Sequence, residues 1–292
     1  MKKQTRALLA IILAAIFGGS NSVMTKIGLR EIPPLSFAAY RFILASIIVL
    51  PIFVKGVKTR RNFLRILGVS LFAAVNITFF VYGIRLTGAT ISQVIYSFVP
   101  VMVGILSYFL IKERITLRKI AGITLGLLGV IITVVLPTLT ETTVLRGNLK
   151  GNLLIFIGAI LFSFYPVLSK SLQKENSPMV LTSGFIITAA LLHIILAVPE
   201  TILQPSWWVG VSWIAWLAGA VLAIFGTVIF YWLWQISIQL GTPTTASMLL
   251  YLQPITAFGW ANILLGEKLI PGLVISGMMI LGGAYLTTQA ES

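Results

Sequence analysis

The chain has 292 residues, of which 58% are hydrophobic and only 10% are charged. Soluble domains carry roughly 25% charged residues, so the composition excludes a water-soluble domain and indicates an integral membrane protein. The net charge of +14 raises nucleic acid as a partner, but the basic residues lie in short connections between apolar runs, which argues against it.

Ten apolar runs follow one another, most of them near the ~20 residues that a helix needs to cross the hydrocarbon core. The first run also resembles a secretion signal, but it continues to Ile27 and many similar runs follow, which favours a transmembrane helix. The runs cover residues 7–28, 35–54, 64–84, 90–111, 118–136, 151–172, 179–199, 212–238, 243–265 and 269–288.

Basic residues are distributed unequally over the alternate connections. Fourteen Lys and Arg fall on the side of the N-terminus and six on the other side. The positive-inside rule therefore predicts a multi-pass protein of the cytoplasmic (inner) membrane with both termini in the cytoplasm.

One stretch occurs twice. Residues 86–113 and 240–267 align at a shift of 154 positions, which places Pro100 on Pro254 near the middle of each apolar run. A proline inside a helix displaces the carbonyl four residues before it, and in lipid such a carbonyl needs protein or a wet cavity. Two interrupted helices at matching places in two halves are typical of a transporter's binding site.

The duplication extends to the whole chain. Lys26 matches Lys170 at a shift of 144, so the second half contains about ten extra residues, which we assign to 201–213. Five spans per unit is an odd number, so the two copies have opposite orientations in the membrane. The sequence thus predicts an all-α membrane protein with ten transmembrane helices in two inverted repeats, 1–145 and 146–292, around a central cavity.

The repeated features resemble the EamA-type branch of the drug/metabolite transporter superfamily. The segments that carry the likeness are GGSNSVMTKIG (18–28), AAYRFILAS (38–46), the Pro100–Glu113 and Pro254–Glu267 intervals of thirteen residues, and the glycine-rich runs 114–130 and 268–284. The resemblance implies a cavity lined by the first four helices of each unit and the movement of small metabolites, often amino acids outward. The second half departs from the pattern, because Phe185 stands at the counterpart of Arg41.

Polar residues of the two proline runs are candidates for binding substrate. Positions three and seven before each proline share a helical face, and they hold Ser97 and Gln93 in the first copy and Tyr251 and Ser247 in the second. Tyr96 extends this stripe. Hydrogen bonding between helices is the alternative role.

Arg41 is the only charge well inside a predicted span. It lies about 10 Å along the helix from the outer end at roughly 1.5 Å per residue. A charge at that depth marks either a binding site or a buried partner. The guanidinium can hold a substrate carboxylate in bidentate fashion, or it can bind backbone carbonyls and extend towards the surface.

Two aromatic runs occupy equivalent places in the repeats. Rings with isolated amides suit a site for a small organic solute, so Tyr82, Trp234 and Gln235 are further candidates. Packing between helices is the alternative.

Glu113 and Glu267 precede the fifth run of each unit, where a carboxylate meets a positive helix end. We interpret both as structural residues, with gating or proton transfer as the alternative. Small residues spaced four apart in the fifth runs, such as Gly122 and Gly126, favour close helix packing within a monomer, with a dimer as the alternative.

The chemistry of the chain favours a transporter over an enzyme. One histidine, no cysteine and no aspartate leave no catalytic or metal-ligand set, so we expect no cofactor and no metal. No acid lies mid-span, which disfavours cationic drugs, and Arg41 favours carboxylate-bearing or zwitterionic solutes. The predicted function is secondary export of small metabolites, with the bilayer and a small solute as partners. Drug efflux, a channel and a scaffold are the alternatives.

Overall fold

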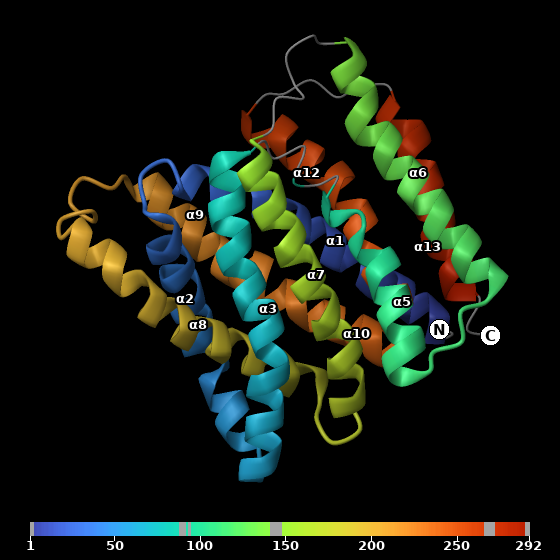
Figure 1. Ribbon diagram of the computed structural model, residues 1–292, viewed down its shortest axis with the longest axis horizontal. Coiled ribbons are helices and arrows are strands. Elements are labelled where there is room, and N and C mark those ends of the chain that lie inside the picture. Colours follow the sequence, from blue (N-terminus) through green and yellow to red (C-terminus); the bar gives the residue numbers. More distant parts are fainter. Residues whose placement is uncertain (1–2, 88–91, 93–94, 141–147, 266–271, 290–292) are drawn as a thin grey trace.

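The computed structural model describes residues 3–87, 92, 95–140, 148–265 and 272–289, and every regular element among them is helical. Figure 1 shows the helices gathered into one bundle, with both termini at the same end of α1. The elements are α1 (Lys3–Gly28), α2 (Pro34–Gly56), α3 (Arg60–Leu86), α5 (Val99–Ile111), α6 (Leu117–Thr140), α7 (Leu149–Leu172), α8 (Pro178–Leu203), α9 (Trp213–Ala223), the π-helical η1 (Ile224–Ile229), α10 (Phe230–Leu240), α11 (Pro243–Ser247), α12 (Leu249–Leu265) and α13 (Gly272–Gln289).

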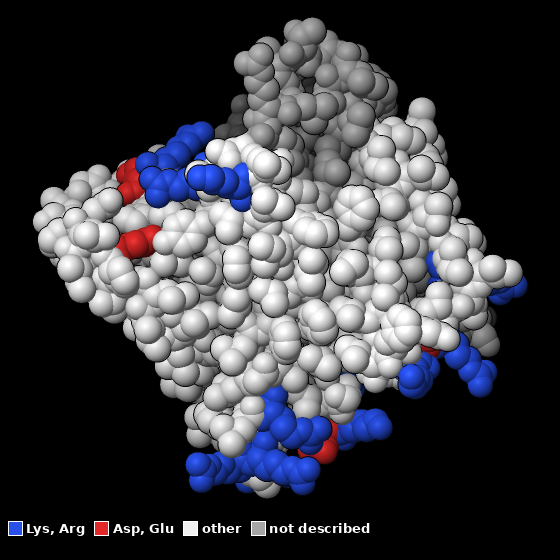
Figure 2. All heavy atoms as spheres, in the orientation of Figure 1, with Lys and Arg blue, Asp and Glu red and all other residues white. Residues whose placement is uncertain are grey.

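Six helices are long and apolar enough to cross a membrane, judged by length and composition. They are α1 from Thr5 onward, α2, α3, α7, α8 and the continuous stretch Trp213–Leu240 made by α9, η1 and α10. Figure 2 shows charged side chains at two opposite margins of the molecule and an uncharged band between them. The chain is therefore a multi-pass membrane protein, while the count of ten spans stays a prediction.

The helices begin where the sequence provides capping groups. The side chains of Thr59, Ser177 and Ser212 accept backbone N–H groups in the first turns of α3, α8 and α9. Pro34 opens α2, where a proline sacrifices no helical hydrogen bond. These caps satisfy the free N–H groups that a helix start exposes.

Helices of the first half pack mainly on helices of the second half. α2 packs on α8 and α6 packs on α13, while α1 packs on α10 and α12, and α3 and α5 both pack on α7. The α2–α8 and α6–α13 pairs are visible in Figure 1 as segments distant in sequence that lie side by side. The core of the bundle is thus built from both halves.

Small residues set the distance between α6 and α13. A Cβ added to Gly122 would lie 2.6 Å from the carbonyl oxygen of Gly283, and one added to Gly283 would lie 2.5 Å from that of Gly122. The backbones therefore touch, as the small-residue spacing predicted for packing within one chain.

The proline runs differ from the expectation of two helices bent at Pro100 and Pro254. α5 begins only at Val99, so Pro100 lies in its first turn and the chain turns at Ser97 and Phe98 before it. A proline is favourable in the first turn of a helix because the N–H that it lacks would have no helical acceptor there. In the second copy the break falls at Met248, between α11 and α12, and Pro254 lies inside α12.

Candidate functional site

A cavity of about 60 Å³ lies in the middle of the bundle, where helices of both halves meet. Its lining combines polar groups with aromatic rings. Its lining comprises Gly18, Asn21, Ser22, Arg41, Asn76, Ile77, Phe80, Ser92, Tyr96, Phe162, Phe230, Tyr231, Leu250 and Gln253. These residues come from α1, α2, α3, α7, α10 and α12 and from the segment before α5.

Arg41 of α2 supplies the charge of this cavity. The residue is only 5% exposed. Its Nε donates to Thr227 Oγ1 at 2.6 Å, and its Nη2 donates to the carbonyl oxygen of Gly226 at 3.0 Å and to Asn21 Oδ1 at 3.3 Å. The guanidinium from the first half is therefore held mainly by groups of the second half.

The π-helical segment η1 makes these acceptors available. Thr227 Oγ1 accepts from Arg41 and donates to the carbonyl oxygen of Leu222, five residues earlier, at 2.9 Å. A Cβ added to Gly226 would lie 2.3 Å from Asn21 Oδ1, so a larger residue there would displace the Asn21 side chain that binds Arg41. Widened turns of this kind leave backbone groups open to other partners and are frequent at functional sites.

Among the described residues the hydrogen-bond acceptors of the Arg41 guanidinium are all neutral oxygens, and the guanidinium also lies over the Phe42 ring, 5.1 Å from its centroid. None of the ion pairs found there involves Arg41. The described glutamates are occupied elsewhere: Glu31 binds Ser212, Glu113 binds Lys119, Glu175 binds Arg65 and Glu200 binds Ser36. A guanidinium stays protonated in proteins, so this buried region carries a positive charge.

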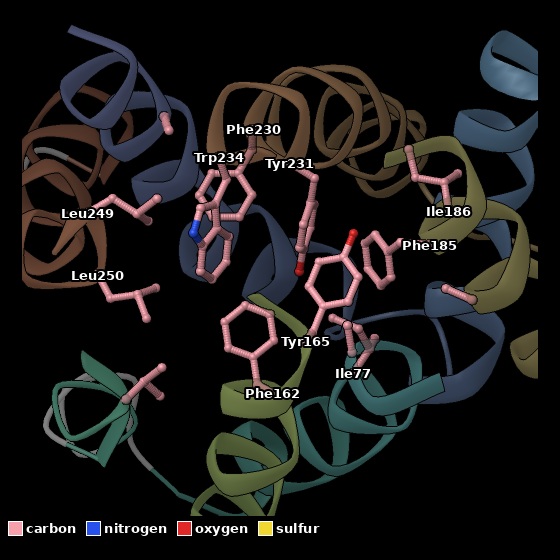
Figure 3. Packing of buried hydrophobic residues seen from close by; sticks show 14 of the residues in the cluster. Ile77, Phe162, Tyr165, Phe185, Ile186, Phe230, Tyr231, Trp234, Leu249 and Leu250 are labelled. Atoms are coloured by element: carbon pink, nitrogen blue, oxygen red, sulfur yellow. The ribbon is translucent and has the colours of Figure 1, made fainter. Parts of the chain in front are cut away.

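Aromatic rings of α7 and α10 also line the cavity. Phe162 lies edge-on to Trp234 with ring centroids 4.8 Å apart, and Phe230 lies 5.6 Å from Trp234. Figure 3 shows Phe162, Phe230, Tyr231 and Trp234 turned towards one another between the two helices. Phe162, Phe230 and Tyr231 reach the cavity, and Trp234 packs behind them.

The lining contains residues at equivalent positions of the two halves. At a shift of 144 Gly18 corresponds to Phe162, and at a shift of 154 Asn76, Ile77 and Tyr96 correspond to Phe230, Tyr231 and Leu250. The two lining residues that lie four positions before Pro100 and Pro254 are Tyr96 and Leu250. The first half contributes mainly polar groups and the second mainly apolar ones.

The structure brings two of the predicted substrate-binding residues, Arg41 and Tyr96, into this lining. The Tyr96 hydroxyl accepts a hydrogen bond from the Asn76 amide. Gln93 lies outside the described residues. Ser97, Trp234, Ser247 and Tyr251 are at most 1% exposed and lie in the packed core rather than in the lining. Their role in binding stays a prediction.

Gln235 and Tyr82 also lie away from the cavity. The Gln235 amide donates to Ser169 Oγ at 3.1 Å and accepts from Gln173 at 2.8 Å, which links α10 to α7. The Tyr82 hydroxyl donates to Glu200 Oε1 at 3.3 Å and is 37% exposed near the end of α3. Both side chains join helices in this structure.

Glu113 forms a buried ion pair with Lys119, and its structural role stays a prediction. Its Oε1 accepts from Lys119 Nζ at 2.8 Å, and both side chains are at most 5% exposed. The free N–H of Lys119 in the first turn of α6 is accepted by Thr116 rather than by the glutamate. Glu267 lies outside the described residues.

Several lining residues were not among the predicted site residues. Gly18, Asn21 and Ser22 occupy one face of α1 at helical spacing, and that spacing of small polar residues in an apolar run was a usable signal. Gly226 and Thr227, which bind Arg41 but do not line the cavity, gave no such signal, because the π-helical turn that directs them to Arg41 follows from tertiary packing. Among the described residues no three His, Cys, Asp or Glu side chains could hold a metal ion.

Comparison with solved structures identifies the fold. A solved crystal structure matches 98% of this chain and 98% of its own chain with a TM-score of 0.77 at 20% sequence identity. At that identity the likeness establishes the fold alone.

The sequence has relatives that are named as transporters. An uncharacterized transporter of Archaeoglobus fulgidus is 24% identical over 96% of this chain and 98% of its own length. The uncharacterized transporter YyaM of Bacillus subtilis is 26% identical over 82% of this chain and 80% of its own. An S-adenosylmethionine uptake transporter of Rickettsia felis is 28% identical over 61% of this chain and 60% of its own.

The family model of EamA-like transporters matches residues 5–135 and again residues 149–289. These two matches cover most of the chain, and the names of the family and of the relatives indicate a transporter rather than an enzyme. The protein is a multi-pass membrane transporter that belongs to the EamA-like transporter family.

Proposed function

We propose that this protein is a secondary transporter of small carboxylate-bearing or zwitterionic solutes, such as amino acids, which it exports across the cytoplasmic membrane by alternating access. Its ten spans form two inverted repeats with both termini in the cytoplasm. The solute binds in the central cavity with its carboxylate on Arg41.

The observation that carries this proposal is the buried, acid-free environment of Arg41. A buried charge without a counter-ion is costly and persists where function requires it. The three neutral acceptors orient the guanidinium but leave its net charge uncompensated. A planar carboxylate matches the donor geometry of arginine in bidentate fashion.

The packing of the helices supports two inverted repeats. The pairs α2–α8 and α6–α13 each join equivalent elements, and the pair α3–α7 has its counterpart in α1–α10. A two-fold relation between the halves generates such pairs. The equivalent residues in the cavity lining are consistent with an axis that passes close to the site.

The size of the cavity supports alternating access. Its volume of about 60 Å³ is small beside the roughly 300–1,000 Å³ of typical ligand pockets. An amino acid enters only if the lining helices of the two halves move apart. The break before α5 and the break between α11 and α12 are suitable bending points.

A zwitterion with a large ring is the second candidate solute. The Rickettsia felis relative is named for S-adenosylmethionine uptake. A carboxylate on Arg41 with a ring against Phe162 and Phe230 would suit such a molecule as well as an amino acid.

Counterflow in proteoliposomes tests the function. Proteoliposomes that contain the purified protein are loaded with unlabelled solute and placed in labelled amino acid, organic acid or S-adenosylmethionine. The uptake of each acid is compared with the uptake of its carboxamide. We expect saturable counterflow and a preference for acid over amide of about tenfold to a hundredfold, the value of one charge-assisted hydrogen-bonded pair. Oriented vesicles then determine the direction.

Arg41→Gln should abolish this preference while leaving residual transport of the amide. Arg61→Gln, which removes an exposed arginine far from the cavity, should retain it. Equal transport of acid and amide by the unaltered protein would contradict the proposed solute class. Transport restricted to lipophilic cations would favour drug efflux, and currents without saturation would favour a channel.

A further inference from the structure

The outer surface of the bundle has an apolar groove of about 500 Å³ between α5 and α6. Gly104 of α5 and Ile123 of α6 form its floor, since a Cβ added to Gly104 would lie 3.7 Å from Ile123 Cδ1. Its lining consists of Val101, Gly104, Ile105, Tyr108, Phe109, Ile115, Ile120, Ile123, Thr124 and Leu127. No charged side chain belongs to this lining.

Three exposed cations stand at the end of this groove, in and beside the α5–α6 connection. They are Lys112, Arg114 and Arg118. Figure 2 shows basic side chains at the lower right margin, where Figure 1 places this connection. The groove thus combines an apolar lining with positive charge at one end.

The local fold removes the only acid of the connection from this surface. Lys112 adopts a left-handed conformation with φ 57°, and the N–H groups of Lys112 and Glu113 both donate to the carbonyl oxygen of Ser107. After this turn Glu113 points inward and pairs with the buried Lys119. Internal pairing cancels these two charges, so the exposed connection has a net charge of +3 from its three free-standing cations.

We propose that this groove binds an anionic phospholipid, with one acyl chain between α5 and α6 and the phosphate against Lys112, Arg114 and Arg118. Any acyl chain fits an apolar groove, but only an anionic headgroup complements the three cations. Each Lys or Arg near an anionic headgroup strengthens binding by about fivefold. This site is separate from the Arg41 cavity and does not rest on the proposed solute.

Native mass spectrometry of the full-length, delipidated protein tests the site. The protein is titrated with phosphatidylglycerol and with phosphatidylcholine of the same acyl chains, and bound lipids are counted. We expect one phosphatidylglycerol to be retained with at least tenfold preference. Inorganic phosphate at millimolar concentration should not displace it, because the acyl chain supplies part of the affinity.

Two variants and one control separate the two parts of the site. The triple change of Lys112, Arg114 and Arg118 to Gln should reduce the headgroup preference to about twofold or less. Thr124→Trp, which fills the groove, should weaken retention of both lipids. The control changes Lys55, Arg61 and Lys174 to Gln, which removes three exposed cations outside this groove.

The control variant should keep the preference. If it loses as much as the site variant, or if the site variant keeps the preference, the localised lipid site is refuted. A dimer that Thr124→Trp abolishes would show instead that a second copy occupies the groove. All variants are compared at equal monodispersity, so a misfolded sample is recognised before titration.

Discussion

Two buried basic residues, Arg41 and Lys119, solve the same physical problem in different ways. Arg41 is 5% exposed and Lys119 is 3% exposed. Lys119 binds the carboxylate of Glu113 at 2.8 Å. Arg41 binds a hydroxyl, an amide oxygen and a backbone carbonyl, and no acid among the described residues.

We expect this difference to distinguish a charge with a structural role, that of Lys119, from one with a role in binding, that of Arg41. Glu113 neutralises the charge of Lys119, so this buried pair can stabilise the α5–α6 connection without any external ion. The charge of Arg41 is not neutralised by its hydrogen-bond partners, because neutral dipoles orient a cation but carry no opposite charge. Burial alone therefore does not predict the role of a basic residue, and the charge of its partner has to be considered as well.

The largest effect on stability should come from breaking the ion pair between Lys119 and Glu113. Lys119→Met leaves Glu113 buried and unpaired, so the free energy of unfolding should fall by about 3–5 kcal/mol. Thermal unfolding in detergent measures this loss. The double variant with Glu113→Gln should recover most of it, and the acid-to-amide preference of transport should not change in either protein. A stable Lys119→Met protein would show that the pair is not the structural element described here.

Substitution of Arg41 by methionine should affect transport more than stability. Arg41→Met removes an uncompensated cation, so we expect stability to change by less than about 2 kcal/mol, the cost of unsatisfied neutral acceptors. Carboxylate transport should fall by about tenfold to a hundredfold. Unfolding and counterflow are measured on the same preparation. Severe destabilisation with unchanged selectivity would assign Arg41 a structural role.

The sequence predicted the parts of this picture that depend on composition and repetition. The helical membrane fold, the family and the isolated charge of Arg41 all follow from apolar runs, repeated motifs and one arginine inside a span. The sequence did not predict that the break falls directly before Pro100, because a proline in an apolar run does not reveal whether it bends a helix or begins one. That choice is made by the turn at Ser97 and Phe98.

Contacts between distant elements were beyond the reach of the sequence. Asn21, Gly226 and Thr227 meet Arg41 only because α1, α2 and η1 pack together, and no spacing in the chain encodes a π-helical turn. The pairing of Glu113 with Lys119 likewise depends on the reversal at Lys112.

Thr227 offers an intermediate test of the role of Arg41. Thr227→Val removes the hydroxyl that accepts from Arg41 Nε but keeps the shape of the side chain. The guanidinium therefore loses one of the hydrogen bonds that orient it. We expect the KM for carboxylates to rise by about fivefold, equivalent to roughly 1 kcal/mol, with amide transport unchanged. Thr227→Ser keeps the hydroxyl and should restore the KM. Equal losses for acid and amide would indicate general damage to η1.

The smallest effect concerns an exposed carboxylate, Glu31, which contrasts with the buried Glu113. The backbone N–H and hydroxyl of Ser212 hold the pKa of Glu31 below its usual range. A carboxyl with a lowered pKa stabilises the fold above its unfolded value of about 4.3, and this contribution is lost as the pH falls through the folded value. Glu31→Gln should therefore lower the melting temperature slightly at pH 7, and the gap should close below about pH 4. A gap that persists in acid would mean that the cap on α9 does not depend on the charge of Glu31.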